Sequence, residues 1–457
     1  MQARLDAVRA FYNSRWYALL ITALIFIGYT TETEVLCFLL MTASILVACF
    51  VAHDFRFAIM PFVGTVCFVT VAHTPGAPTY SDYYGTAPIL PILIVAFGAI
   101  LAGFAVFAIR NRKRANPFPQ RGVFLSLVIL SVALCLNGVF NSAYTVQNLA
   151  FAASFPLTLV VTFLLFSLFV DFKKDASEHF MFCMVLAGVL IVLQLAYMFA
   201  CTDMIKFDEH GDIQKDSIVL GWAVHNSFAG LLTMLIPACF YFAATHRFGW
   251  IFYGLGLVEL LTVVISQSRA ATLVGGLIVL LCMIAVCFFG KNKRINRFLT
   301  AGVFAVGILG VVFLWDKISG LFHNLLTNGF WDNGRFEIWK TGIDQFLSHP
   351  IFGAGFYDDA ITAEEVLGWN LQIYPNLYHN TLIQMLGAAG IVGLGAYLWH
   401  RFCTVRLALT RPSLYKSMLA IGLLALVLFS LLDVLFFITY PLLYYALFLV
   451  FMEKAEE

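Results

Sequence analysis

Apolar stretches of about membrane-spanning length recur from one end of this 457-residue chain to the other. A helix needs about 20 mostly apolar residues to cross the hydrocarbon core of a bilayer. Only 12% of the residues are charged, about half the share in a water-soluble domain. These features predict an all-α integral membrane protein. We expect about 12–14 spans, near residues 16–30, 35–52, 57–73, 87–109, 122–140, 149–170, 180–200, 223–244, 248–265, 271–289, 298–315, 380–400, 417–435 and 438–452.

The positions of lysine and arginine predict how the chain is oriented. When alternate connections are assigned to the side of the N-terminus, that side receives 21 of the 27 Lys and Arg residues, and the other side receives six. Because positively charged loops stay in the cytoplasm, we predict an even number of spans with both termini cytoplasmic. The net charge is only +1, so nothing indicates a nucleic-acid partner.

One outer connection is much longer than the others and divides the chain into three parts. Residues 316–379 form this predicted extracytoplasmic loop, between transmembrane helices in 1–315 and in 380–457. Long loops without the composition of disorder are usually functional. The stretch GRFEIWKTGIDQFLSHP has apolar residues at helical spacing. It predicts an amphipathic helix on or near the membrane plane, ended by Pro350 and the glycines that follow.

Three polar residues at the outer boundary of the spans are candidates for chemistry: Arg269, Arg335 and His379. An arginine can hold phosphate through two parallel hydrogen bonds, and a histidine can exchange a proton near neutral pH. Each residue also has a simpler explanation. Arg269 can extend toward lipid headgroups, and His379 can cap a helix. Arg335 can form an ion pair with Glu337 or Asp332.

Two further features are weaker candidates. His225 and Asn226 open a span from the outer side, where such a pair is more often a packing contact. Glu259 lies inside a span, where it must be protonated or paired. The sequence has no P-loop and no Asp-x-Asp pair, and its ten cysteines show no metal-ligand spacing. We therefore expect no metal site, no cofactor and a substrate that is already activated.

At these residues the chain resembles the superfamily of O-antigen ligases and O-antigen polymerases, and it is closest to the ligases. Two ligase patterns, Arg-x3-Leu and His-[Asn/Ser/Gln]-x9-Gly-x2-[Gly/Thr/Tyr], are matched by Arg269 with Leu273 and by His379 with Asn380, Gly390 and Gly393. The stretch from Arg335 to Gly355 is similar to the loop signature of the family.

The resemblance implies a GT-C-like fold and a metal-independent, inverting glycosyl transfer. The donor would be a glycan on undecaprenyl pyrophosphate, and the acceptor a sugar hydroxyl such as that of lipid A core. The reaction would occur at the outer face of the bacterial inner membrane.

The resemblance also implies roles for individual residues. Arg269 and Arg335 would hold the pyrophosphate and stabilise its charge as it leaves, and His379 would act as the base or orient the acceptor. Outer aromatic residues such as Trp331, Tyr374 and Tyr378 can stack on sugars or form an interfacial belt. We expect substrate binding by Asn380, Tyr378, Trp339, Glu337, Gln267, Ser268, His225 and Asn226.

Several alternatives stay open. The Arg-x10-Gly pattern of the polymerases is missing, since Leu280 and Phe346 stand at the glycine positions, and this favours a ligase. A polymerase would use a lipid-linked acceptor, and a protein O-glycosylating transferase would usually carry a large further outer domain. A transporter or flippase of lipid-linked sugars belongs to another class. It would place ionisable residues near mid-span, where only Glu259 fits.

Overall fold

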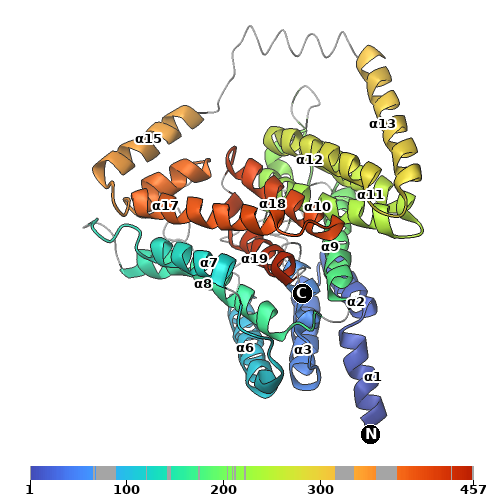
Figure 1. The fold of residues 1–457 in the computed structure, drawn as a ribbon, viewed down its shortest axis with the longest axis horizontal. Coiled ribbons are helices and arrows are strands. Elements are labelled where there is room, and N and C mark those ends of the chain that lie inside the picture. The colour runs from blue at the N-terminus through green and yellow to red at the C-terminus, as the bar shows by residue number, and fades with distance from the viewer. Residues whose placement is uncertain are drawn as a thin grey trace.

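A computed structural model describes residues 2–454 apart from 65–66, 68–88, 120, 142–145, 173–174, 203, 208, 210–212, 221–222, 314–333, 357–377 and 434. Nearly all regular structure in this part is helical (Figure 1). The α-helices are α1 (Gln2–Tyr12), α2 (Arg15–Thr30), α3 (Glu34–Val51), α4 (Ile59–Gly64), α6 (Ile89–Asn111), α7 (Arg121–Cys135), α8 (Val146–Phe169), α9 (Ala176–Cys201), α10 (His225–Thr245), α11 (Gly249–Ile265), α12 (Arg269–Phe288), α13 (Lys293–Phe313), α15 (Arg335–Ser348), α17 (Thr381–Leu409), α18 (Leu414–Ser430) and α19 (Thr439–Lys454).

The remaining elements are short. Four 3-10 helices are described, η1 (Phe55–Ala58), η3 (Arg112–Arg114), η4 (Lys215–Ser217) and η5 (Leu435–Phe437). The strands β1 (Val219–Leu220) and β2 (Ala223–Val224) pair antiparallel, with Val219 opposite Val224. This small hairpin leads directly into α10.

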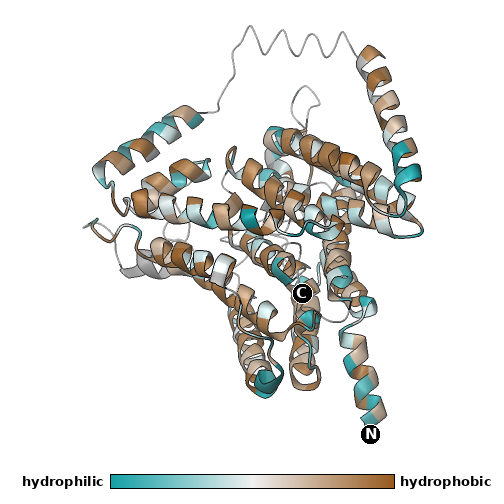
Figure 2. Ribbon diagram, in the orientation of Figure 1, coloured by the Kyte–Doolittle hydropathy of each residue, from teal (hydrophilic) through white to brown (hydrophobic). Residues whose placement is uncertain are grey.

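The helices confirm the predicted membrane class. Seven helices of the described part are long and apolar enough to cross a bilayer, or eight if the bent pair α1–α2 is one span. Four other apolar helices have only 10–17 residues, less than a straight crossing needs. Figure 2 shows apolar residues along most helices and hydrophilic residues at many of their ends. The chain is therefore a multi-pass membrane protein. Each predicted span coincides with a helix, although the span expected at 57–73 is described only as far as Gly64 as a helix.

The centre of the bundle is α10, which is apolar on all sides and almost completely buried. It packs against α9, α11, α12 and α18. Glycines let α10 and α18 approach closely. A Cβ at Gly230 would lie 2.7 Å from the Phe429 ring, and one at Gly422 would lie 2.8 Å from the Met234 carbonyl oxygen. This contact fixes the end of α18, which carries part of the candidate site.

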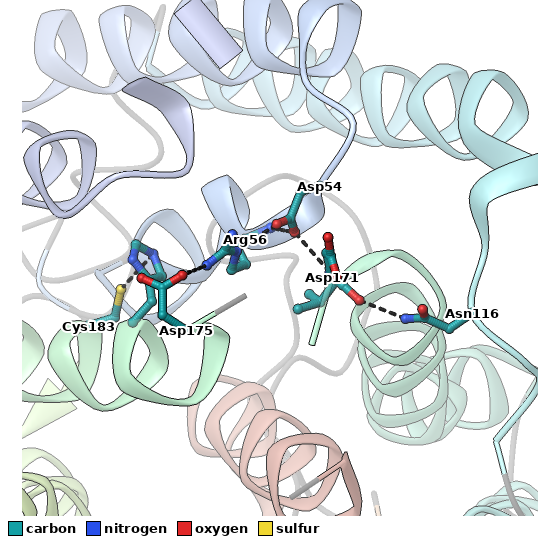
Figure 3. Close-up of polar contacts among 8 residues, drawn as sticks. Asp54, Arg56, Asn116, Asp171, Asp175 and Cys183 are labelled. Atoms are coloured by element: carbon teal, nitrogen blue, oxygen red, sulfur yellow. Dashed lines mark hydrogen bonds and ion pairs between the residues drawn. The ribbon is translucent and has the colours of Figure 1, made fainter. Parts of the chain in front are cut away.

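A network of ion pairs centred on the buried Arg56 joins two connections between helices (Figure 3). The Arg56 Nε donates to Asp54 Oδ2 at 2.6 Å, and its Nη1 donates to Asp175 Oδ1 at 3.0 Å. Asp54 Oδ1 accepts from the Asp171 amide at 3.2 Å. Burial raises the pKa of the Asp54 carboxyl, and the Arg56 guanidinium opposes that rise. The connections after α3 and α8 are thereby held together.

The connection after α6 is bonded to the end of α8, because Asn116 Nδ2 donates to the carbonyl oxygens of Ser167 and Val170 at 3.0 and 2.7 Å. The distribution of lysine and arginine predicts that these three connections lie on one side of the membrane, and the structure brings them into contact.

The helix α17 is broken at Gly390, where another segment enters its hydrogen-bond ladder. Gly390 has φ 64° and ψ −161°. The amides of Ala354 and Gly355 donate to the carbonyls of Gly387 and Ala388 at 2.9 and 3.0 Å. Beyond the break, the amide of Ile391 donates to the Pro350 carbonyl at 2.9 Å. The inserted segment 350–355 therefore satisfies backbone groups that the break exposes, as a membrane interior requires.

Candidate active site

The amphipathic helix that the sequence predicts is present as α15, and it begins at Arg335. Gly334, with φ 77°, turns the chain into the helix. The Arg335 side chain is half-buried, and its Nη1 donates to the carbonyl oxygen of Leu432, just after the end of α18. No ion pair joins Arg335 to Glu337 in the described part, and Asp332 lies outside it.

Asn380 anchors the start of α17. Its Oδ1 accepts from the amides of Leu382 and Ile383 at 2.9 and 3.2 Å, which is the usual bonding of a helix N-cap. Its Nδ2 donates to the Leu431 carbonyl at 2.9 Å. The cap is therefore Asn380 and not His379, and Asn380 ties the start of α17 to the end of α18.

His379 precedes this cap in a left-handed backbone conformation, with φ 49°. Such a φ is uncommon for a residue other than glycine and often marks a functional position. The His379 Nδ1 lies 2.9 Å from Asp433 Oδ1. The His379 side chain is 36% exposed, whereas that of Asp433 is 15% exposed. Since a carboxylate accepts, the ring carries its proton on Nδ1 when neutral. This leaves Nε2 as a base without a protein partner among the described residues.

Three consecutive residues after α18 thus bring the candidate site residues together. Leu431, Leu432 and Asp433 contact Asn380, Arg335 and His379 in turn. Asp433 is not among the site residues that the sequence predicts, and its place beside His379 is a finding of the structure. The available signal was an acidic residue between two apolar stretches, at the same predicted outer boundary as His379.

Arg269 is the first residue of α12 and does not contact His379, Arg335 or Asp433 through any hydrogen bond of the described part. Ser268 caps this helix, its hydroxyl oxygen accepting from the Ala271 amide at 3.4 Å, and Gln267 has φ 60°. Among the described residues, Arg269 makes no hydrogen bond or ion pair, and it lines an open hollow of about 380 Å³ with Gln267, Thr272 and Leu273. The start of a helix attracts anions, so an arginine there suits a phosphate.

The helix that Arg269 begins packs beside the helix whose end contacts Arg335. The helix α12 packs against α18, which ends at the His379 group. Figure 1 shows the starts of α12, α15 and α17 along the same upper part of the molecule. No hydrogen bond joins Arg269 to His379 or Arg335 in the described part of the chain.

The other predicted binding residues lie in different surroundings. Glu337 is exposed, and Trp339 is half-buried and meets the Phe336 ring edge-to-face at 5.4 Å. Tyr378 is only 5% exposed. Its ring lies between α15 and α17, close to Gly342 and Gly387, so it packs the two helices together. The predicted sugar-stacking residues Trp331 and Tyr374 lie outside the described residues.

The remaining candidates lie in the bundle. His225, the first residue of α10, is buried and Asn226 is half-buried, and α10 packs against α18 and η5. Glu259 is completely buried, with its Oε1 accepting from the Cys239 thiol at 3.3 Å. Its carboxyl group lies where a Cβ at Gly188 would be. Glu259 is therefore packed among α9, α10 and α11.

The comparison with protein families gives a match over part of the chain. Residues 232–398 match the family model described as O-antigen ligase. The matched stretch includes Arg269, Arg335 and His379 and ends before Asp433. No curated protein matches the chain. The chain therefore carries a domain of the O-antigen ligase family at residues 232–398.

Proposed function

We propose that this protein transfers a glycan from undecaprenyl pyrophosphate to a sugar hydroxyl, such as one on lipid A core, at the outer face of the bacterial inner membrane. The observation that carries the proposal is the His379–Asp433 pair beside Arg335. A base with a fixed tautomer lies next to a cation suited to a pyrophosphate, on a family domain whose members act on glycans.

His379 is the proposed general base. With its Nδ1–H directed to Asp433, Nε2 accepts the proton of the acceptor hydroxyl. Asp433 stabilises the imidazolium that results, and it acts through His379 as a positioning residue. Asn380 supports the same geometry by capping α17 against the end of α18.

Arg335 and Arg269 are the proposed pyrophosphate ligands. One Arg335 nitrogen holds the Leu432 carbonyl, and the other guanidinium N–H groups have no protein partner among the described residues. Fixed cations that meet the charge developing on a leaving group lower the barrier of transfer. Arg269, at the start of α12, supplies the second cation.

The proposed step is a direct displacement. The acceptor oxygen forms a bond to the anomeric carbon, and the bond from that carbon to the pyrophosphate oxygen breaks. The leaving pyrophosphate keeps the electron pair, and the hydroxyl proton passes to His379. One displacement inverts the anomeric configuration, and chelation of divalent metals is expected to leave the rate unchanged.

Transfer by the purified protein tests this proposal. A lipid-linked oligosaccharide is the donor, and lipid A core and a second lipid-linked unit are offered as acceptors. We expect transfer to core, lowered about 10²- to 10⁴-fold by His379→Ala and about 10²- to 10³-fold by Arg335→Ala or Arg269→Ala. Matched controls are His246→Ala and Arg247→Ala, next to the other end of α10.

The acceptor that is used distinguishes the alternatives. Growth of a ladder on the lipid carrier would show a polymerase with the same site. Failure to transfer to either acceptor, together with flipping of lipid-linked sugars in liposomes, would replace the enzyme by a transporter. Full activity of all three site variants would overturn the mechanism.

A further inference from the structure

The end of α3 is surrounded by arginine side chains from two other helices. From α1, the Arg9 Nε donates to the Val51 carbonyl at 2.9 Å. From α6, the Nη1 and Nη2 of Arg110 donate to the carbonyls of Cys49 and Ala52, the first at 2.9 Å. The helices α3 and α6 lie side by side (Figure 1), and the last carbonyls of a helix have no partner within it. Arginines that are about 100 positions apart in the chain therefore meet at one helix end.

These cations carry more charge than the helix end needs. The end of a helix carries about half a negative charge, and Asp6 pairs with Arg9 at 2.9 Å. Arg110 has no carboxylate partner among the described residues. Arg114, four residues further on, is exposed and makes no hydrogen bond or ion pair in the same part of the chain. The arginine cluster, which consists of Arg9, Arg110 and Arg114, is therefore left with an unbalanced positive charge.

His53 lies among these charges. Its Nδ1 is 3.1 Å from the Oδ1 of Asn111. Burial is the largest cause that lowers the pKa of the His53 imidazole, and the positive charges of Arg114, Arg9 and Arg110 lower it further, against the hydrogen bond with Asn111. All three guanidinium groups thus act on the same ring, and an anion bound between them would relieve their repulsion.

Exposed apolar side chains border the cluster on all three helices. Ile109, next to Arg110 on α6, is 69% exposed, Phe50 on α3 is 62% exposed, and Phe11 on α1 is 41% exposed. Because α3 and α6 are both long and apolar enough to cross a bilayer, their exposed apolar side chains face lipid chains and their ends reach the headgroups. The guanidinium groups of the cluster are then at the depth of the lipid phosphates.

We propose that Arg9, Arg110 and Arg114 bind the phosphate of an anionic phospholipid. Guanidinium groups hold phosphate oxygens through charge-assisted hydrogen bonds, and basic pockets between transmembrane helices bind acidic lipid headgroups. The lysines and arginines of the chain predict that this side is cytoplasmic, so the lipid is one of the cytoplasmic leaflet and is distinct from the glycan donor. The lipid site does not rest on the proposed function.

Native mass spectrometry of the full-length protein in detergent tests the site. The protein is titrated with phosphatidylglycerol, with zwitterionic phosphatidylcholine and, separately, with inorganic phosphate. We expect phosphatidylglycerol to bind more tightly than phosphatidylcholine, and the double variant Arg110→Gln with Arg114→Gln to lower its affinity about 25-fold. Equal affinity for the two lipids would overturn the inference. Inorganic phosphate that binds as tightly as the lipid and displaces it would show a site for a soluble anion and overturn it as well.

A single variant separates lipid binding from stability. Arg110 bonds two carbonyls of α3, so its loss can also loosen the helices, whereas Arg114 makes no such bond. We expect Arg114→Gln to lower the affinity for phosphatidylglycerol about fivefold with an unchanged thermal midpoint in lipid-free detergent. The matched control is Arg294→Gln in α13, which is also exposed and on the same predicted side. An equal loss in both variants would show a general effect of charge, and no loss in Arg114→Gln would remove this residue from the site; either result overturns the inference.

Discussion

The side chain of His379 has its two ring nitrogens in different surroundings. Nδ1 is bonded to Asp433, and Nε2 has no protein partner among the described residues. Histidines that act as bases usually need a second group that fixes the ring and its tautomer. The hydrogen bond from the Asn380 side-chain amide to the Leu431 carbonyl holds the two sides of this pair together.

At the same scale, Asp433→Asn tests the positioning role. The amide can keep the ring in place but cannot neutralise the imidazolium, so we expect kcat to fall about 10²-fold with little change in KM. The measurement is the initial rate of transfer over a range of acceptor concentrations. Asp344→Asn, on the exposed face of α15, is the control, and the thermal midpoint should be unchanged for both. A normal kcat for Asp433→Asn would show that catalysis by His379 does not depend on the Asp433 carboxylate.

At the scale of elements, the insertion of segment 350–355 into α17 explains why the family pattern contains glycines. A Cβ at Gly353 would overlap the backbone of Ala388, and one at Gly390 would overlap the Ile351 carbonyl. Both glycines also have φ near +65° to +70°, which other residues rarely adopt. The segment also bonds the connection after α7, since the Gly138 amide donates to the Phe352 carbonyl at 2.9 Å.

Gly390→Ala and Gly353→Ala should therefore damage this junction. We expect each to lower the free energy of unfolding by at least about 1–3 kcal/mol, the cost of a strained backbone, and to lower transfer because α15 and α17 shift relative to each other. Thermal unfolding in detergent and the transfer assay measure the two effects. Gly395→Ala is the control, because a Cβ there has nothing within 4 Å. If all three variants had the same thermal stability and the same transfer rate, the insertion would not have this structural role.

At the scale of the whole molecule, buried charges hold distant parts of the chain together. The Arg56 and Asp54 side chains are 5% and 8% exposed, whereas Asp175 is 67% exposed. We expect Arg56→Met to destabilise the protein by about 3–5 kcal/mol, because it leaves Asp54 buried without its partner. Asp175→Asn should cost less than about 1 kcal/mol, as an exposed pair does. Thermal midpoints in detergent compare the two, and similar losses would contradict the assignment of Asp54 as the buried partner.

The orientation of the whole chain stays a prediction of its lysines and arginines. With both termini cytoplasmic, Cys201 at the end of α9 lies on the outer side. A membrane-impermeant maleimide should label it in intact spheroplasts, and Cys201→Ser should remove the signal. Labelling that appears only after the membrane is opened would reverse the orientation.

Much of the fold and part of the site were open to prediction. The helix positions follow from local hydrophobicity, and the boundary positions of Arg335 and His379 follow from the ends of those stretches. The roles of Tyr378 and Asn380 were less accessible, because packing against Gly342 and capping toward Leu431 depend on how α15, α17 and α18 meet. The network at Arg56 was missed for the same reason, since Arg56 bonds Asp175 from 119 positions away.

The sequence by itself determined that the chain is a helical membrane protein, and it predicts which of its boundary residues serve pyrophosphate binding and proton transfer. Hydrophobicity, helical period and motif spacing are local properties, so they can be read along the chain. Only the tertiary structure decided which groups meet. Asp433 lies 54 positions from His379, and Leu432 lies 97 positions from Arg335. Those contacts exist because the glycine-rich packing of α18 on α10 brings one helix end to the starts of two others.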